Sequence, residues 1–126
     1  MGSAADDIAS GVMAKWAAAF GRMDAEALSS LYSKHALFFG SNPNLYRGRD
    51  GVAAYFRGLP RWQSSSVRFS EIVAEQVNAD LVSVAGTANF AFDGSALSVK
   101  ITWVIAREDF DWKIVSHHAS SKAPLL

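Results

Sequence analysis

The stretch TWVIAREDFDWKIVSHHASS, residues 102–121, contains two runs in which large apolar side chains alternate with small or polar ones. A period of two is typical of β-strands, and the polar break between the two runs marks a tight turn. The stretch therefore predicts an antiparallel hairpin of two long strands, near residues 95–107 and 111–120. Because successive side chains of a strand point to opposite faces, His117 and His118 are expected to point apart.

Alternation of the same kind predicts two more strands upstream, near residues 66–77 and 80–92. The first half of the chain has a helical pattern instead, with apolar residues three or four positions apart. Asp6 or Asp7 is expected to cap a first helix, and Asp24 a second, because a carboxylate can accept hydrogen bonds from the free N–H groups of a first turn.

The second helix is expected to reach Tyr32, and a short strand is expected over residues 36–40. A third helix, near residues 50–59, ends before Pro60, which cannot continue it. Helices followed by strands predict an α+β domain in which the helices pack on one face of a curved sheet.

The composition is that of one globular domain spanning residues 1–126, with flexible ends at 1–5 and 122–126. Twelve basic and twelve acidic residues balance, so nucleic acid and anionic membranes are not expected as partners. The chain contains no cysteine, which excludes disulfides and thiolate metal sites. We expect a soluble cytoplasmic protein, because no apolar stretch is long enough to span a bilayer.

Three stretches together resemble the nuclear transport factor 2-like superfamily. They are WAAAFGRMDAEALSSLYSKHALFFG (16–40), LYRGRDGVAAYFRGL (45–59) and TWVIAREDFDWKIVSHHASS (102–121). Within that superfamily the chain is similar to SnoaL-like proteins and to the calcium/calmodulin-dependent kinase association domain. The resemblance implies a cone-shaped, cystatin-like fold, in which three N-terminal helices and a strongly curved, mostly antiparallel sheet enclose a pocket. It also implies a homodimer, or a larger ring, formed through the other face of the sheet.

The resemblance also allows two known activities to be tested by position. In steroid isomerases of this fold, acid–base and oxyanion residues would fall at Trp16, Gly40 and Trp103, none of which supplies that chemistry here. In the kinase association domain, pocket arginines would fall at Trp103 and Ala119. Their loss argues against a strongly anionic ligand, because little remains to pair a buried carboxylate.

Aromatic side chains from the helices and the sheet are expected to converge on the pocket, which then suits a small, flat, apolar or aromatic ligand. His117 adds a polar group that could act as a general acid or base, although no carboxylate lies beside it in the sequence. The predicted dimer interface consists of Trp112, Ile114 and His118. The predicted ligand pocket consists of Trp16, Tyr32, Phe38, Tyr55, Phe56, Trp103 and His117.

These features favour a small-molecule-binding SnoaL-like protein. One alternative is an isomerase, cyclase or dehydratase acting on a cyclic carbonyl or polyketide-like compound, with His117 as the acid–base residue. A second alternative is an oligomeric assembly module. We expect no cofactor and no metal, since the chain has no spaced ligand set such as HExxH, no phosphate-binding glycine loop and no nucleophile elbow.

Overall fold

The computed structural model describes residues 3–126. Over these residues the chain forms three helices and six strands, with most of the strands in the second half of the sequence. In chain order they are α1 (Ala4–Gly21), α2 (Ala25–Ser29), β1 (Tyr32–Phe39), β2 (Leu45–Arg47), α3 (Gly48–Arg57), β3 (Ser65–Asn78), β4 (Leu81–Phe92), β5 (Ser95–Glu108) and β6 (Asp111–Ser121).

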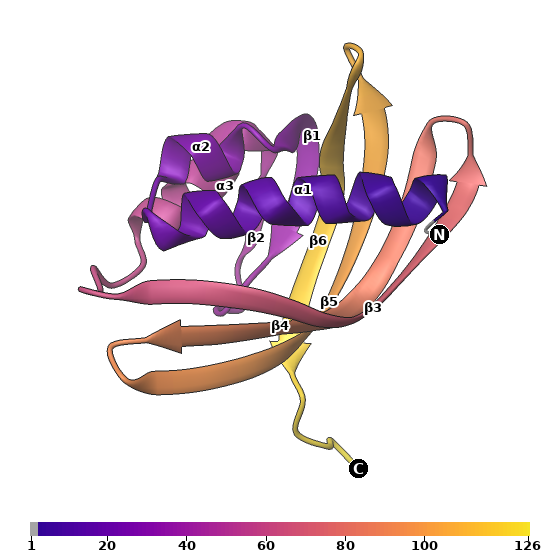
Figure 1. The fold of residues 1–126 in the computed structure, drawn as a ribbon. Helices are drawn as coiled ribbons and strands as arrows, with labels where there is room; N and C mark the ends of the chain where they lie inside the picture. Colours follow the sequence, from indigo (N-terminus) through magenta and orange to yellow (C-terminus); the bar gives the residue numbers. More distant parts are fainter. Residues whose placement is uncertain (1–2) are drawn as a thin grey trace.

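All six strands belong to one sheet, in the order β2-β1-β6-β5-β4-β3. Neighbouring strands are antiparallel except β1 and β6, which run parallel. The sheet bends strongly without closing, and the helices lie on its concave side, with α1 running across the long strands (Figure 1). The predicted α+β fold, with helices on one face of a curved and mostly antiparallel sheet, is confirmed.

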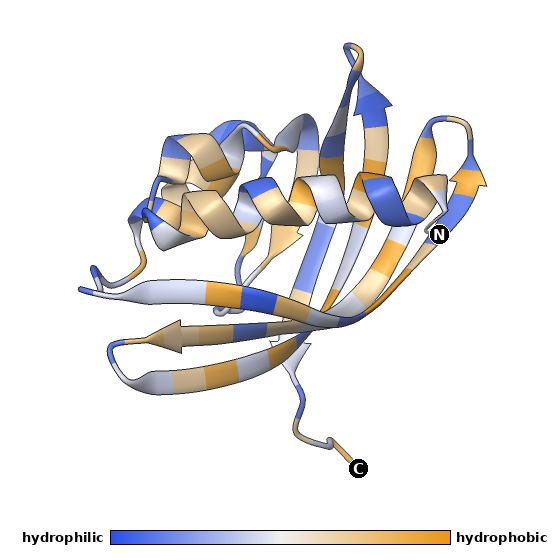
Figure 2. Cartoon of the chain, viewed as in Figure 1, coloured by the Kyte–Doolittle hydropathy of each residue, from blue (hydrophilic) through white to orange (hydrophobic). Residues whose placement is uncertain are grey.

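The bend of the sheet has a local cause in β3 and β4. Glu71 has a φ of 55°, and the pairing of β3 with β4 shifts register between Ser70 and Val73, which is a β-bulge. Gly86 of β4 lies opposite this bulge, where a Cβ atom would collide with the side chain of Ile72. The bulge and the glycine together let the two strands curve around the helices (Figure 2 shows the alternation of polar and apolar residues along them).

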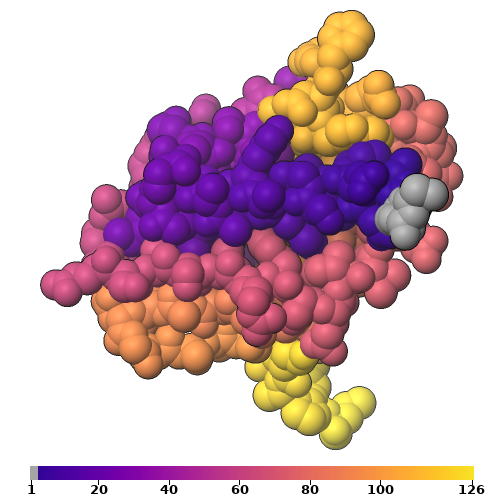
Figure 3. All heavy atoms as spheres, in the orientation of Figure 1, coloured from indigo at the N-terminus to yellow at the C-terminus, as the bar shows by residue number. Residues whose placement is uncertain are grey.

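Helix α1 begins earlier than predicted. Ser3 is its N-cap, and Asp6 completes a capping box by accepting a hydrogen bond from the Ser3 N–H. Ala4 and Ala5 belong to this helix and Ala5 is buried. The flexibility of segment 1–5 stays a prediction, and Met1 and Gly2 lie outside the described residues. Figure 3 shows α1 lying across this side of the molecule, while the turn between β5 and β6 projects beyond it.

The other predicted flexible end is fastened at its start. Lys122 Nζ lies 3.2 Å from Glu71 Oε1 and donates to Thr87 Oγ1 at 3.1 Å. Thr87 donates in turn to the same carboxylate at 2.9 Å. Lys122, which follows β6, therefore reaches across β5 to contact β3 and β4. Leu125 and Leu126 are fully exposed.

The four long strands lie within one or two residues of their predicted bounds, but the region between α2 and α3 differs. Tyr32 is not the last residue of a helix: α2 ends at Ser29, and Tyr32 opens β1, where it pairs with Ile114. The short strand β2 was not predicted. Asp24 caps α2 as predicted, with its carboxylate accepting from the Ala27 N–H at 3.0 Å.

A second register shift corrects the predicted dimer interface. Ile105 pairs with Ile114 and Val104 pairs with Ser116, so Val115 is an extra residue in β6. The bulge brings Ile114 to the same concave face as His117, and Ile114 is completely buried there. Trp112 also packs against the core on this face, where its ring lies under Arg107. Of the three predicted interface residues, only His118 lies on the convex face.

Candidate functional site

A cavity of about 440 Å³ lies between the helices and the concave face of the sheet. Its wall is almost entirely apolar and contains no Asp, Glu, Lys or Arg among the described residues. The lining residues are Trp16, Phe20, Phe38, Gly40, Ser41, Tyr55, Phe56, Leu59, Pro60, Trp62, Phe69, Ala88, Phe90, Phe92, Leu97, Val99, Ile101, Trp103, His117, Ala119, Ser120 and Ser121.

The structure brings six of the seven predicted pocket residues to this wall. Tyr32 is the exception, since it is completely buried and lies behind His117 rather than on the cavity surface. The misplacement follows from its assignment to a helix: as the first residue of β1, Tyr32 points its ring into the core instead. The six residues on the wall are Trp16, Phe38, Tyr55, Phe56, Trp103 and His117.

Four buried side chains form one chain of hydrogen bonds beside the cavity. The Trp16 indole N–H donates to the Tyr32 hydroxyl at 3.0 Å. That hydroxyl lies 2.9 Å from Nδ1 of His117, and the Trp103 indole N–H donates to the same Nδ1 at 2.9 Å. Four elements, α1, β1, β5 and β6, thus meet at a single polar point in an apolar core.

The chemistry of these donors determines which nitrogen of His117 carries the proton. An indole N–H can only donate, so Nδ1 must present its lone pair to Trp103. Burial, reinforced by the charge that His118 can carry, lowers the pKa of His117 to about 3, so its ring is neutral at physiological pH. Burial raises the pKa of Tyr32 far above its usual value, so its hydroxyl keeps its proton and can share it with Nδ1.

The plane of the His117 ring is held by aromatic packing. Phe38 stacks on it with ring centroids 4.1 Å apart and an interplanar angle of 27°. Phe38 in turn contacts Tyr55 and Phe56 of α3, at centroid distances of 4.7 and 5.6 Å. The imidazole therefore has a fixed orientation relative to the cavity.

One end of the cavity wall carries hydroxyl groups. The Tyr55 hydroxyl accepts from the Ser41 N–H at 2.9 Å and donates to Ser41 Oγ at 2.7 Å. Gly40 precedes this pair, and a Cβ atom there would lie 2.5 Å from the Tyr55 ring and 2.7 Å from Phe38. Position 40 therefore cannot hold an aspartate without moving the aromatic wall, which agrees with the loss of the isomerase base.

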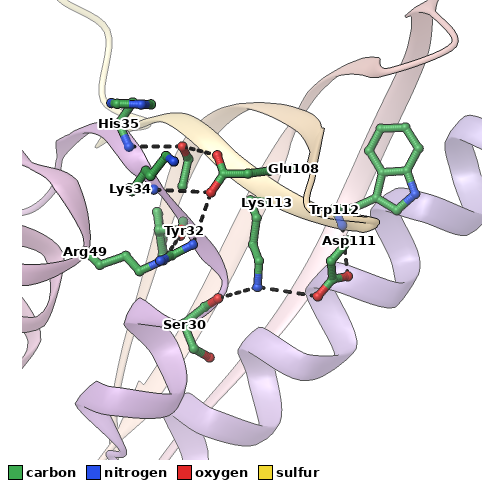
Figure 4. A network of polar contacts seen from close by, with 10 residues as sticks. Ser30, Tyr32, Lys34, His35, Arg49, Glu108, Asp111, Trp112 and Lys113 are labelled. Atoms are coloured by element: carbon green, nitrogen blue, oxygen red, sulfur yellow. Dashed lines mark hydrogen bonds and ion pairs between the residues drawn. The ribbon is translucent and has the colours of Figure 1, made fainter.

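A cluster of polar contacts where β1 begins and β5 ends includes the backbone of Tyr32 (Figure 4). The Arg49 Nε–H donates to the Tyr32 carbonyl at 2.8 Å, and Arg49 Nη2 pairs with Glu108 at 3.0 Å. Glu108 also accepts from Ser33 Oγ at 2.6 Å, and these contacts lower the pKa of its carboxyl, with the Ser33 hydrogen bond as the largest cause. The cluster joins β1, α3 and β5 where β1 leaves the regular pairing with β6.

Much of the cavity wall was not predicted from the sequence. Phe69, Phe90 and Phe92 occupy alternate positions of β3 and β4, and the period of two in these strands could have placed them on the concave face. Trp62 had no such signal, because it lies in the irregular connection between α3 and β3. It stacks on Phe92 with ring centroids 4.5 Å apart.

Residues 3–126 contain no group of three or more His, Asp or Glu side chains arranged to hold a metal ion. None of their helices is both long enough and apolar enough to cross a membrane.

The sequence profile of the SnoaL-like domain matches residues 10–124. Because the match covers nearly the whole chain, the chain belongs to the SnoaL-like domain family. A comparison with curated protein sequences gave no significant match.

Solved structures agree with this assignment. A protein provisionally assigned as a calcium/calmodulin-dependent protein kinase II association domain, from Xanthomonas campestris, has a TM-score of 0.86 at 19% identity and covers 100% of this chain and 91% of its own. A provisionally assigned scytalone dehydratase from Novosphingobium aromaticivorans has a TM-score of 0.85 at 14% identity, with coverages of 94% and 84%. An NTF2-like protein of unknown function from Pseudomonas putida has a TM-score of 0.82 at 14% identity, with coverages of 99% and 92%. The resemblance to the NTF2-like superfamily is confirmed, and these likenesses concern the fold alone.

Proposed function

We propose that this member of the SnoaL-like domain family binds a small, uncharged, mostly apolar molecule in the cavity between its helices and its sheet. One observation carries the proposal: the cavity has a volume of about 440 Å³ and an aromatic wall without charged side chains. Sites for small molecules commonly have volumes of about 300–1,000 Å³, with apolar walls and a few polar groups. His117 and the hydroxyls of Tyr55 and Ser41 are such groups here.

An acid–base enzyme has less support from the same geometry. A neutral histidine acts as a general base through a free lone pair that can reach the substrate. The lone pair of His117 lies on Nδ1, which Trp103 and Tyr32 already occupy at 2.9 Å each. No carboxylate lines the cavity wall among the described residues to take over that role.

The binding proposal is tested with the neutral fluorescent probe N-phenyl-1-naphthylamine. We expect saturable binding of one probe per chain, and loss of that binding in Ala119→Phe, which fills the cavity from β6. Ala91→Phe is the matched control, because Ala91 is exposed on the convex face of β4 and does not line the cavity. Equal binding by both variants would place the probe on the surface and refute the proposal.

We also propose that a second copy of the chain covers the convex face of the sheet. Leu37, Phe39 and Leu45 of the β1–β2 edge are 48, 39 and 47% exposed there, and Phe39 lies beside His118 with ring centroids 5.4 Å apart. Next to His118 on the same convex face lies Thr102, which pairs with His118 and carries no charge. A two-fold axis would place this apolar patch against itself, as homodimers require.

A further inference from the structure

The hydrogen bonds at His117 determine the face that it presents to the cavity. Its Nδ1 is occupied by Trp103 and Tyr32, so the single proton of the neutral ring resides on Nε2. Over the described residues, every completely buried side-chain nitrogen or oxygen has a hydrogen-bond partner. Nε2 makes no such bond within this part of the chain, so it retains some exposure, and the surface that His117 exposes belongs to the cavity wall.

Several independent contacts keep the proton of His117 on Nε2. Protonation of Nδ1 would set its N–H against the Trp103 N–H, two donors at 2.9 Å with no acceptor between them. The Tyr32 hydroxyl accepts from Trp16 at 3.0 Å, which leaves its own proton for Nδ1. Phe38 stacks on the ring and opposes its rotation. The cavity therefore contains an oriented imidazole N–H donor in a mostly apolar surrounding.

We propose that the Nε2–H of His117 is the specificity-determining donor of this cavity, and that it selects an uncharged flat ligand carrying an acceptor oxygen such as a ring carbonyl. Trp103, Tyr32 and Trp16 are positioning residues, since they act by holding the proton on Nε2. The inference rests on the proposed binding function and adds the chemical class of the ligand.

The same wall disfavours ligands of either charge, because its described residues offer no counter-charge. A carboxylate would enter an apolar space in which the described residues offer no Lys or Arg to pair it, and one neutral N–H does not offset that desolvation. An ammonium group would lose its hydration, would find no Asp or Glu among the described residues of this wall to pair it, and would meet the N–H of His117 as a second donor. A neutral carbonyl loses less hydration than a charged group and can accept a hydrogen bond from the Nε2–H of His117.

The tautomer is tested first, in the ligand-free protein, so that the result does not depend on binding. With ¹⁵N-labelled histidine, we expect Nε2 of His117 to resonate as a protonated nitrogen and Nδ1 as an unprotonated one, with no change between pH 8 and pH 5. Trp103→Phe removes one donor to Nδ1 and is expected to give a mixture of tautomers. A proton on Nδ1 in the wild-type chain, or an imidazolium at pH 5, would overturn the proposal.

The ligand class is tested with 1-tetralone and tetralin, which share a ring system and differ by one carbonyl oxygen. Both are measured by displacement of N-phenyl-1-naphthylamine. A hydrogen bond of ordinary strength corresponds to about fivefold to tenfold in affinity, so His117→Phe should lower the ratio of tetralone to tetralin affinity by about that factor. His35→Phe, on an exposed part of β1, is the control and should leave the ratio unchanged.

The outcomes separate this inference from the function on which it rests. A ratio that falls in His117→Phe and persists in His35→Phe supports both. Binding of both probes with an unchanged ratio in His117→Phe would overturn the donor role and leave the binding function standing. Failure of the wild-type chain to bind either probe or the fluorescent reporter would overturn the binding function and the ligand class together.

Discussion

The two faces of β6 carry neighbouring histidines in opposite settings. His117, on the concave face, is buried, has its Nδ1 within 2.9 Å of the Trp103 indole N–H and of the Tyr32 hydroxyl, and has its pKa lowered to about 3. His118, one residue later on the convex face, is exposed and lies beside Phe39. The same side chain thus becomes a fixed neutral donor on one face and a surface group on the other. The surroundings that each face provides, rather than the residue type, decide its chemistry.

The largest difference between the faces is expected in stability, at two neighbouring positions of β5. Trp103 is buried on the concave face, and Trp103→Ala should lower the free energy of unfolding by about 3–5 kcal/mol through the cavity it creates. Thr102, exposed on the convex face, should change it by no more than about 0.5 kcal/mol on replacement by alanine. Urea denaturation at equal protein concentration measures both. Similar losses in the two variants would contradict the assignment of the faces.

The second contrast appears on acidification. In the unfolded chain a histidine titrates near pH 6.5, whereas His117 in the folded chain titrates at about 3. The unfolded chain therefore binds an extra proton below pH 6.5, and this group lowers stability progressively as the pH falls toward 3, with no effect above 6.5. By pH 4 the loss amounts to about 3 kcal/mol.

Two variants isolate this acid sensitivity. His118→Phe should retain it, whereas His117→Phe should lose it and keep only the part that comes from carboxyls such as Glu108 and Asp111, whose pKa values are lowered in the folded chain. Stability is measured by urea denaturation from pH 7 to pH 4. Parallel pH profiles for the wild-type chain and His117→Phe would show that His117 is not held neutral by the fold.

The sequence predicted which face of the sheet a side chain occupies only where the pattern that indicates it lies within one strand or helix. The hairpin of β5 and β6 was predicted almost to the residue, because alternation along each strand is a local property. The bulge at Val115 was not, since an extra apolar residue beside Ile114 leaves no mark in the pattern, and it moved Ile114 and Trp112 to the other face. Tyr32 was misplaced because its strand exists through pairing with β6, far away in the sequence.

Six of the seven predicted pocket residues line the cavity, because helix and strand periods indicate directly which side chains face the concave side. Trp16 faces inward by its helical spacing, and Trp103 and His117 by their positions in one hairpin. The hydrogen bonds that join them to Tyr32 were beyond prediction. They depend on distances among four elements, and the sequence contains no pattern for such a contact.

A smaller effect is expected at the polar cluster where β1 begins and β5 ends. Glu108→Gln keeps the shape of the side chain but weakens its contacts with Ser33 and Arg49, and should lower stability by about 1 kcal/mol. Glu75→Gln, at an exposed position of β3, is the matched control with little effect expected. Histidine NMR adds a second readout, because a shifted Nδ1 resonance of His117 in Glu108→Gln would show that the cluster positions Tyr32. An unchanged resonance would limit the cluster to stability.

The smallest change in the stability of a single chain is expected on the convex face, at Thr102, where the same substitution should abolish dimer formation. Thr102→Lys adds a charge to an exposed position between Ala85 and His118, and should change the stability of a single chain by no more than about 0.5 kcal/mol. Two such lysines would meet across a two-fold axis, so native mass spectrometry should show monomers. Thr102→Val keeps the shape without charge and should remain dimeric. A dimer that survives Thr102→Lys would show that two chains pair through another surface. The proposal that the convex face forms the dimer interface would then be wrong.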